Sequence, residues 1–319
     1  MDLQTLQKRA SVIRQVRSFF DGKNYLELDT PLLSPDLIPE SCLEVFETSR
    51  IYPAGSRKEK QSLYLIPSPE IHMKKIIARH RVNIYQICKC FRNGESCGHL
   101  HNSEFTMLEY YTMNADYTDS LALTEELFTY LAEKEDAPFL KAPFERITVA
   151  DAFKKYAGFD LFKAAENGGL EEQARKLGLE PPPGMTTGEL YDLIFIHSVE
   201  PRLKTEKPTA LIDYPAFVPC LAKRSHNKKT VERWELYYSG IELANCFSEE
   251  TDPQTVKDFF ISEEEEKKKS ALVRHKADHD YHKIFWDFPR CSGVAMGLDR
   301  LIMAITGRST IDSVIITDC

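Results

Sequence analysis

The stretch FRNGESCGHLHNSEFTMLEYY, residues 91–111, contains the pattern that decides the fold. The run before it, VNIYQICKCF (82–91), is rich in β-branched and aromatic residues and predicts a buried strand. A polar loop follows, and FTMLEYY (105–111) predicts a returning strand. Side chains two apart on a strand share one face, which here would hold Phe105, Met107, Glu109 and Tyr111. This combination predicts the wall of a pocket, although an antiparallel hairpin with a partly exposed acidic face would also account for the carboxylate.

Outward from this hairpin, the remaining elements follow one another without a regular strand–helix repeat. Apolar residues at helical spacing predict helices over 3–20, 69–80 and 119–134. Strand-like runs are YLELDTP, SLYLIP, ALIDYPAFVP and RWELYYSGIELANCF, whereas VAMGLDRLIMAITG (294–307) has the pattern of a helix. Strands therefore dominate both ends of the chain, which predicts an α+β fold with an antiparallel sheet flanked by helices.

The domain organisation is predicted to be a single mixed domain over residues 1–319. Residues 143–200 are mostly helical in pattern, are broken by the Gly- and Pro-rich GLEPPPGMTTGE, and contain no chemical motif. We interpret them as a helical insertion.

Composition and charge exclude several classes of protein. No run of about eighteen apolar residues occurs, and charges are scattered through MDLQTLQKRASVIRQ, so we expect a cytoplasmic protein with no membrane segment. The formal net charge of -8 argues against a general nucleic-acid binder, because non-specific phosphate binding needs a surplus of Lys and Arg. The basic cluster within 223–229 is interpreted as a solvated loop, and a local binding patch is the alternative.

Two further clusters have ordinary interpretations. Cys88, Cys90, Cys97, His99 and His101 are of the types that zinc accepts, but cysteines in an apolar strand more often serve as small buried residues, and we expect reduced thiols. The run EEEEKKK at 263–269 predicts the exposed part of a helix with i,i+4 ion pairs and needs no function.

Charged residues also interrupt two later strand-like or apolar segments. RWELYYSGIELANCFSEE (233–250) places Glu235, Glu242 and Glu249 among aromatic residues. Buried carboxylates require a partner, and carboxylates beside phosphates commonly hold Mg²⁺. In CSGVAMGLDRL (291–301), glycines allow a ligand to approach the backbone, and an arginine follows them.

Together these segments resemble the class II aminoacyl-tRNA synthetases, and specifically the lysyl-tRNA synthetase branch. The family's first motif is matched by SFFDGKNYLELDTP, its second by FRNGES and HNSEFTMLEYY, and its third by AMGLDR. The agreement in order covers nearly the whole chain. The resemblance extends, through IPSPEIHMKK and YYSGIELANCF, to synthetase paralogues that attach (R)-β-lysine to a lysine of elongation factor P and lack the anticodon-binding domain. It implies no recognition of a tRNA anticodon, and a homodimer formed through the first motif.

The resemblance implies a role for each nucleotide-site residue. Arg92 would bridge the α-phosphate and the attacking carboxylate, and Phe105 would stack on adenine, with Arg300 on its other side reaching the γ-phosphate. Arg92 and Arg300 are thus the expected catalytic residues. The expected ATP-binding residues also include Asn93, Glu95, His101, Asn102, Glu242 and Gly297, and the expected Mg²⁺ ligands are Glu235 and Glu242.

The resemblance also implies an amino-acid site for a substrate with two amines. Ser68, Glu70 and Asn245 would hold its amino and carboxylate end, and Glu109, Tyr111 and Glu249 would meet the far ammonium. Ala295 stands where lysyl-tRNA synthetases of this type have glycine. An added methyl in a tight pocket can shift preference by about 1–3 kcal/mol, which favours β-lysine over α-lysine.

Two positions depart from the family pattern. The loop after Arg92 reads Asn93-Gly94-Glu95, one residue longer than usual, so Glu95 would supply the carboxylate that reads adenine. Cys246 replaces a glycine, and its side chain would reshape the amino-acid pocket.

The resulting hypothesis is an ATP- and Mg²⁺-dependent ligase that activates (R)-β-lysine as an adenylate and transfers it to a lysine side chain of elongation factor P. The alternatives are a related ligase that uses α-lysine with tRNA or another acceptor, and a non-catalytic paralogue that binds an amino acid.

Overall fold

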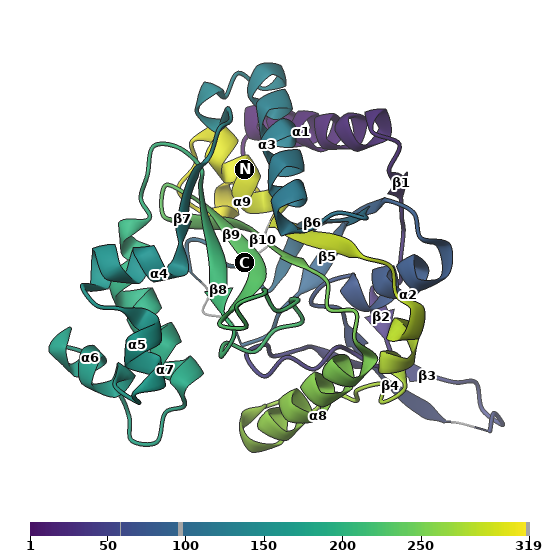
Figure 1. Ribbon diagram of the computed structural model, residues 1–319. Helices are drawn as coiled ribbons and strands as arrows, with labels where there is room; N and C mark the ends of the chain where they lie inside the picture. The colour runs from purple at the N-terminus through teal and green to yellow at the C-terminus, as the bar shows by residue number, and fades with distance from the viewer. Residues whose placement is uncertain (58, 95–97, 317–319) are drawn as a thin grey trace. The chain divides into compact units, whose positions relative to one another are not determined.

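The computed structural model describes residues 1–57, 59–94 and 98–316. The chain consists of two compact units: unit 1 is Met1–Asn114 with Glu250–Cys319, and unit 2 is Ala115–Glu249. Figure 1 labels their helices and strands. Within the described ranges, no helix is both long and apolar enough to cross a membrane.

Unit 1 contains a mixed sheet with helices. Its strands follow the order β1 (Leu26–Glu27), β5 (Ile84–Phe91), β6 (Glu104–Met113) and β11 (Cys291–Gly297). β1 and β5 are parallel, and the other pairs are antiparallel. A small antiparallel sheet has the order β2 (Leu33–Ser34), β4 (Lys60–Leu65), β3 (Glu47–Ile51). The helices are α1 (Leu3–Gly22), α2 (Glu70–His80), α8 (Pro253–Ser270) and α9 (Leu298–Thr306), with short 3₁₀ turns at Tyr281–Asp287 and Ile311–Ser313.

Helix α1 covers one face of this sheet. The Asp2 side chain caps its first turn by accepting from the Thr5 N–H at 2.7 Å. Phe20, which is fully buried, stacks on Tyr85 of β5 at 4.8 Å and lies 4.9 Å from Tyr110 of β6. Alternation along the strands therefore leaves the opposite face of β5 and β6 to the side chains of the predicted pocket.

Unit 2 contains a second set of strands. They follow the order β10 (Ile241–Ser248), β9 (Thr230–Tyr238), β8 (Thr209–Pro215) and β7 (Glu145–Thr148), antiparallel except for the β7–β8 pair. The α-helices are α3 (Tyr117–Lys134), α4 (Val149–Ala152), α5 (Leu161–Glu166), α6 (Leu170–Lys176) and α7 (Thr187–Ile194). Short π or 3₁₀ segments are Pro138–Leu140, Phe153–Ala157, Phe195–Val199 and Glu200–Arg202.

The helices after β7 pack on the strands of unit 2. Phe153, Tyr191 and Phe195 form a stacked aromatic row within a core that includes Leu211 of β8 and Tyr237 of β9. The mostly helical content expected after residue 143 is present, except that its first residues form β7. The boundaries 143–200 and the single domain over 1–319 stay predictions.

The architecture confirms the α+β class, and two local expectations were wrong. Residues 294–297 are not helical, because β11 pairs with β6 as far as Gly297 opposite Met107, and helix α9 begins only at Leu298. The strand expected over YLELDTP is reduced to Leu26–Glu27, the residues that pair with β5. In both segments the pairing available in the tertiary structure overrides the local pattern.

The expectation for residues 263–269 was also wrong in part. They lie in α8, as predicted, and Lys268 forms an i,i+4 ion pair with Glu264. However, Glu263 and Lys267 are buried, at 5% and 4% exposure. One face of this charged run therefore belongs to the interior.

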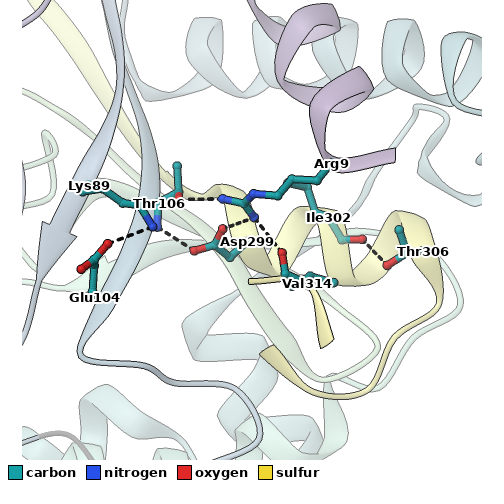
Figure 2. A network of polar contacts seen from close by, with 8 residues as sticks. All are labelled: Arg9, Lys89, Glu104, Thr106, Asp299, Ile302, Thr306 and Val314. Carbon is teal, nitrogen blue, oxygen red and sulfur yellow. Dashed lines mark hydrogen bonds and ion pairs between the residues drawn. The ribbon is translucent and has the colours of Figure 1, made fainter. Parts of the chain in front are cut away.

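A buried polar network joins α1, β6 and α9. Arg9 donates to Asp299 at 2.5 Å, to the Thr106 hydroxyl at 2.8 Å and to the Val314 carbonyl at 3.1 Å (Figure 2). The second carboxylate oxygen of Asp299 accepts from the Thr106 N–H at 2.6 Å. The network fixes the start of α9, and with it the adjacent Arg300, against the strand that carries Phe105.

Replacing Arg9 with Gln should lower the free energy of unfolding by about 3–5 kcal/mol, because the Asp299 side chain is only 2% exposed and would be left as an uncompensated buried charge. Urea denaturation measures the loss. Arg17→Gln is the matched control on the same helix, since its pair with Glu27 is exposed and should be worth at most about 1 kcal/mol. Equal losses in the two variants would contradict the structural role of Arg9.

Candidate active site

The predicted pocket wall lies on the face of β5, β6 and β11 opposite α1. The register pairs Glu109 with Gln86 on one side and with Ala295 on the other. On β11, the residue opposite Tyr111 is Gly293, so β11 adds no side chain beside the phenol. The sequence pattern could indicate the face of β6, but only the strand pairing places Ala295 beside Glu109.

Glu109 is a buried carboxyl group on β6. It is 3% exposed, and its Oε1 accepts from the Tyr111 hydroxyl at 2.8 Å. Among the described residues, nothing donates a hydrogen bond to its buried Oε2. Burial, and secondarily the neighbouring Glu70 carboxylate, raise the pKa of Glu109 well above its usual range. The group is therefore a buried acceptor suited to a bound cation.

Glu70 lies in the first turn of α2, directly after Pro69. Its Oε1 accepts from the ammonium of Lys74, which is fully buried one turn later. Ser68 is half-buried just before this turn. The sequence assigned Lys74 only to the periodicity of a helix, because nothing in the local pattern distinguishes it from the exposed Lys75.

Arg92 and Phe105 are brought together at the ends of β5 and β6. The Arg92 Cζ lies 5.2 Å from the centre of the Phe105 ring, which is within the range of a cation–π contact. The Arg92 N–H donates to the Ser103 carbonyl at 3.0 Å, which closes the hairpin. The side chains predicted to handle the phosphates and adenine are therefore neighbours in unit 1.

Arg300 and His101 form a second pair. The Arg300 Nη2 lies 2.8 Å from the His101 Nε2, and because a guanidinium only donates, this ring nitrogen must be the unprotonated acceptor. The Arg300 Nε donates to the Leu100 carbonyl at 3.3 Å. The stem of Arg300 also covers Gly297, where an added Cβ would meet it at 3.5 Å.

The loop between these pairs is anchored at Asn93. Its N–H donates to the Glu44 carbonyl at 2.9 Å, and its side-chain oxygen accepts from the Gly94 N–H at 2.9 Å. Asn102 is half-buried between His101 and β6. The predicted adenine contact at Glu95 lies outside the described residues.

Two of the site residues expected in unit 2, Glu235 and Asn245, belong to a network that the sequence did not indicate. Arg233 donates to Glu235 at 2.6 Å and to the Asn245 side-chain oxygen at 3.1 Å, and it lies over the Tyr214 ring at 4.5 Å. The Tyr237 hydroxyl donates to the other oxygen of Glu235 at 2.7 Å. Arg233 was missed, although its two-residue spacing from Glu235 was a usable signal.

The remaining predicted residues of unit 2 follow the β10 register. Glu242 is opposite Tyr237, and the buried Glu249 follows β10 and forms a backbone bridge with Ala222. Cys246 pairs with Trp234, whose indole donates to the Tyr117 carbonyl of α3 at 2.6 Å.

Cys246 is therefore on the face of β10 that faces α3, opposite the face of Asn245. The expectation that its side chain reshapes the amino-acid pocket was wrong, because strand alternation directs it into the core.

The cysteines on β5 are thiols. Cys88 and Cys90 place their sulfur atoms 3.8 Å apart, and Cys90 is fully buried. Within the described residues, no group of three or more His, Cys, Asp or Glu is arranged to hold a metal ion. Cys97 lies outside these residues.

Comparison with known proteins shows the family to which the chain belongs. Residues 2–316 match the family described as tRNA synthetases class II (D, K and N), and the chain belongs to that family of ATP-dependent ligases.

Several curated relatives match 98% of the chain. It is 34% identical to the elongation factor P–(R)-β-lysine ligase of Avibacterium paragallinarum and 35% identical to that of Histophilus somni (strain 2336), and covers 94% of each. It is 33% identical to the lysine–tRNA ligase of Carboxydothermus hydrogenoformans, of which it covers 64%. The chain thus spans almost the full length of the first two relatives and less than two thirds of the third.

Glu109→Gln should stabilise the protein while abolishing the binding of a cationic amino acid. A carboxyl group whose pKa is higher in the folded than in the unfolded state lowers stability as the pH rises from the unfolded towards the folded value, so the wild type is penalised at neutral pH. Glutamine removes this cost and retains the acceptor for Tyr111. We expect Tm at pH 7 to rise by roughly 1–2 °C, the effect of about 1 kcal/mol in a chain of 319 residues.

Thermal melts at about pH 4 and pH 7 test the sign of this effect. The gain should shrink at the lower pH, where the unfolded-state carboxyl group is also protonated. A loss of stability at pH 7 would show that Glu109 is ionised and paired in the empty protein.

Proposed function

We propose that this protein activates (R)-β-lysine with ATP and transfers the β-lysyl group to a lysine side chain of elongation factor P. The observation that carries the proposal is the buried Glu109 Oε2, which has no hydrogen-bond donor among the described residues and lies near the Glu70 carboxylate. A lysine-like substrate supplies the ammonium that such a site lacks. A neutral analogue would leave the carboxylate unpaired, which costs several kcal/mol.

The reaction would proceed in two steps. In the first, the substrate carboxylate attacks the α-phosphorus of ATP, an acyl–phosphate bond forms, and pyrophosphate leaves. In the second, the neutral ε-amine of the acceptor lysine attacks the acyl carbon, AMP leaves, and the amine loses a proton. Arg92 would stabilise the charge that develops at the α-phosphate, and Arg300 would hold the γ-phosphate, with neutral His101 accepting from its guanidinium.

The proposed cofactor is Mg²⁺, held by Glu235 and Glu242. Carboxylate oxygens suit this ion, and it would offset phosphate charge when bound. Glu235 accepts from Arg233 and Tyr237, and each of its oxygens retains lone-pair capacity for an ion. Arg233 would fix the orientation of the Glu235 carboxylate by donating to its Oε1.

Ala295 is proposed to select β-lysine over α-lysine. It lies opposite Glu109 in the β6–β11 register, so its methyl group occupies the wall that also carries the carboxylate. Shifting the amine by one carbon changes how the substrate backbone fits such a wall. The proposed partner, elongation factor P, follows from the two ligase relatives. We also propose a cytoplasmic location and a homodimer formed through the first motif.

Pyrophosphate exchange dependent on an amino acid tests the proposed substrate. The expected result is a higher kcat/KM with (R)-β-lysine than with α-lysine, and mass spectrometry of purified elongation factor P should show one added β-lysyl group. Equal or reversed preference would contradict the substrate assignment. Charging of total tRNA with labelled lysine would support the α-lysine alternative, and absence of adenylate with any amino acid would support the non-catalytic one.

Ala295→Gly should narrow the preference for β-lysine by about tenfold, because one methyl group in a tight pocket is worth about 1–3 kcal/mol. Ala210 on β8 provides a matched control, since Ala210→Gly removes the same methyl from a buried strand that carries none of the predicted site residues. The ratio of kcat/KM values for the two lysines is the measurement. If the ratio changes equally in both variants, the effect comes from a general loss of packing and not from the position of Ala295.

A further inference from the structure

A loop before β3 is fastened to α8 by two buried side chains of opposite charge. The Lys267 ammonium donates to the carbonyl of Glu40, at 2.7 Å, and to that of Leu43. The Glu263 Oε2 accepts from the Ser41 N–H at 2.6 Å. Both side chains are at most 5% exposed. We call these contacts the α8 lock.

Glu44, a residue of the same loop, holds the loop to the segment after α8 with its own side chain. Its carboxylate accepts from the N–H groups of Leu272 and Val273, at 2.8 and 3.1 Å, just after α8 ends. Its backbone carbonyl accepts from the Asn93 N–H at 2.9 Å. The loop is thus fixed between α8 and the turn that follows Arg92.

The α8 lock bonds to the backbone carbonyl of Glu40 and does not involve its carboxylate. No hydrogen bond joins the Glu40 carboxylate to any described residue, although the residue is partly buried. A loop that needed only to be closed would not require an acidic residue there. A small or neutral side chain would avoid the cost of desolvating a carboxylate.

Glu40 is close enough to the site residues to interact with them electrostatically. Burial, then the Glu70 carboxylate, raise its pKa, and Arg92 lowers it; with weaker effects from Glu263 and Lys267, the pKa of Glu40 is about 7. Glu70 also raises the pKa of Glu109. Glu70 therefore interacts electrostatically with both Glu40 and Glu109.

The charges of this group complement a diamino acid. Three carboxyl groups, Glu40, Glu70 and Glu109, share two cations, Lys74 and Arg92, so full ionisation leaves one uncompensated negative charge. A lysine isomer carries two ammonium groups and one carboxylate. Its net positive charge would balance the group, which an amino acid with a neutral side chain could not do.

We propose that Glu40 is a further residue of the amino-acid site, which binds, together with Glu70, the amino group nearest the reacting carboxylate. This rests on the proposed function, because it assumes a lysine-like substrate whose carboxylate meets Arg92. Glu109 takes the far ammonium, and the α8 lock holds Glu40 in place. Lys267 and Glu263 are positioning residues for the site, since they act through the loop and contact no substrate.

The pH dependence of binding follows from the same contacts. Because the pKa of Glu40 is about 7, protonated and ionised forms of its carboxyl group both occur near neutral pH. An ammonium favours the ionised form, so binding releases a proton, and affinity increases as the pH rises from about 6 to about 8. The charged groups that face Glu40 are Glu70 on α2, Arg92 after β5, and Glu263 and Lys267 on α8.

Isothermal titration of (R)-β-lysine without ATP, on the full chain, tests the proposal directly. We expect Glu40→Gln to weaken binding about tenfold or more at pH 8 and to remove the component of the pH dependence centred near 7. Glu47→Gln, an exposed carboxylate on β3, is the matched control and should bind as the wild type does. Equal dissociation constants for Glu40→Gln and the wild type would overturn the proposal.

The α8 lock is tested by Lys267→Met against Lys268→Met, which removes an exposed ammonium from the same helix. The first should weaken binding and raise KM in pyrophosphate exchange with little change in kcat, and the second should change neither. A folded Lys267→Met protein, judged by its thermal melt, that binds with wild-type affinity and pH profile would overturn the positioning role.

Failure of this inference and failure of the proposed function give different results. If the wild type catalyses pyrophosphate exchange with β-lysine and Glu40→Gln binds β-lysine as tightly as the wild type, the proposed function stands and Glu40 is not part of the site. Binding of β-lysine that depends on Glu40, without adenylate formation, would retain the inference and remove the ligase function. Absence of binding by the wild type would overturn both.

Discussion

The buried carboxylate of Asp299 is the constraint on which unit 1 depends. It accepts from the backbone of β6 through one oxygen and from Arg9 of α1 through the other. Because an unpaired charge at this depth would be costly, the strand, the first helix and the last helix must form together. The helix that starts there carries Arg300 directly after Asp299, so the same interaction that stabilises the unit also fixes the side chain proposed to hold the γ-phosphate.

The carboxyl groups of the proposed site in unit 1 differ from Asp299 in their hydrogen bonding. Asp299 is fully satisfied within the protein, whereas Glu109 keeps an oxygen without a donor among the described residues, and Glu40 has a carboxylate outside the α8 lock. Such groups lower the stability of the folded protein at neutral pH, and they would gain a partner in the proposed complex with a cationic substrate. Stability and recognition therefore compete at these carboxyl groups, while Asp299 and Arg9 serve stability.

Several features could be predicted because they depend on short-range patterns. The alternation in FTMLEYY indicated one face bearing Phe105 and Glu109, and the three motifs in order indicated the family and its α+β fold. Other features failed for identifiable reasons. Residues 294–297 have a helical pattern but form a strand, because they pair with β6. Cys246 faces α3, because successive side chains of β10 point to opposite faces. Lys74 and Lys267 carry no local sign of burial, since each is followed in its helix by an exposed lysine.

The sequence by itself determined the residue types, the periodicity of the elements and the motifs, because these depend on neighbours a few residues away. Only the tertiary structure decided which charges are buried and what they meet. Glu263 and Lys267 look like a solvated run, and they became interior because the loop of Glu40 packs on α8. The burial of these two side chains depends on contacts between segments distant in the chain, and no local pattern encodes such contacts.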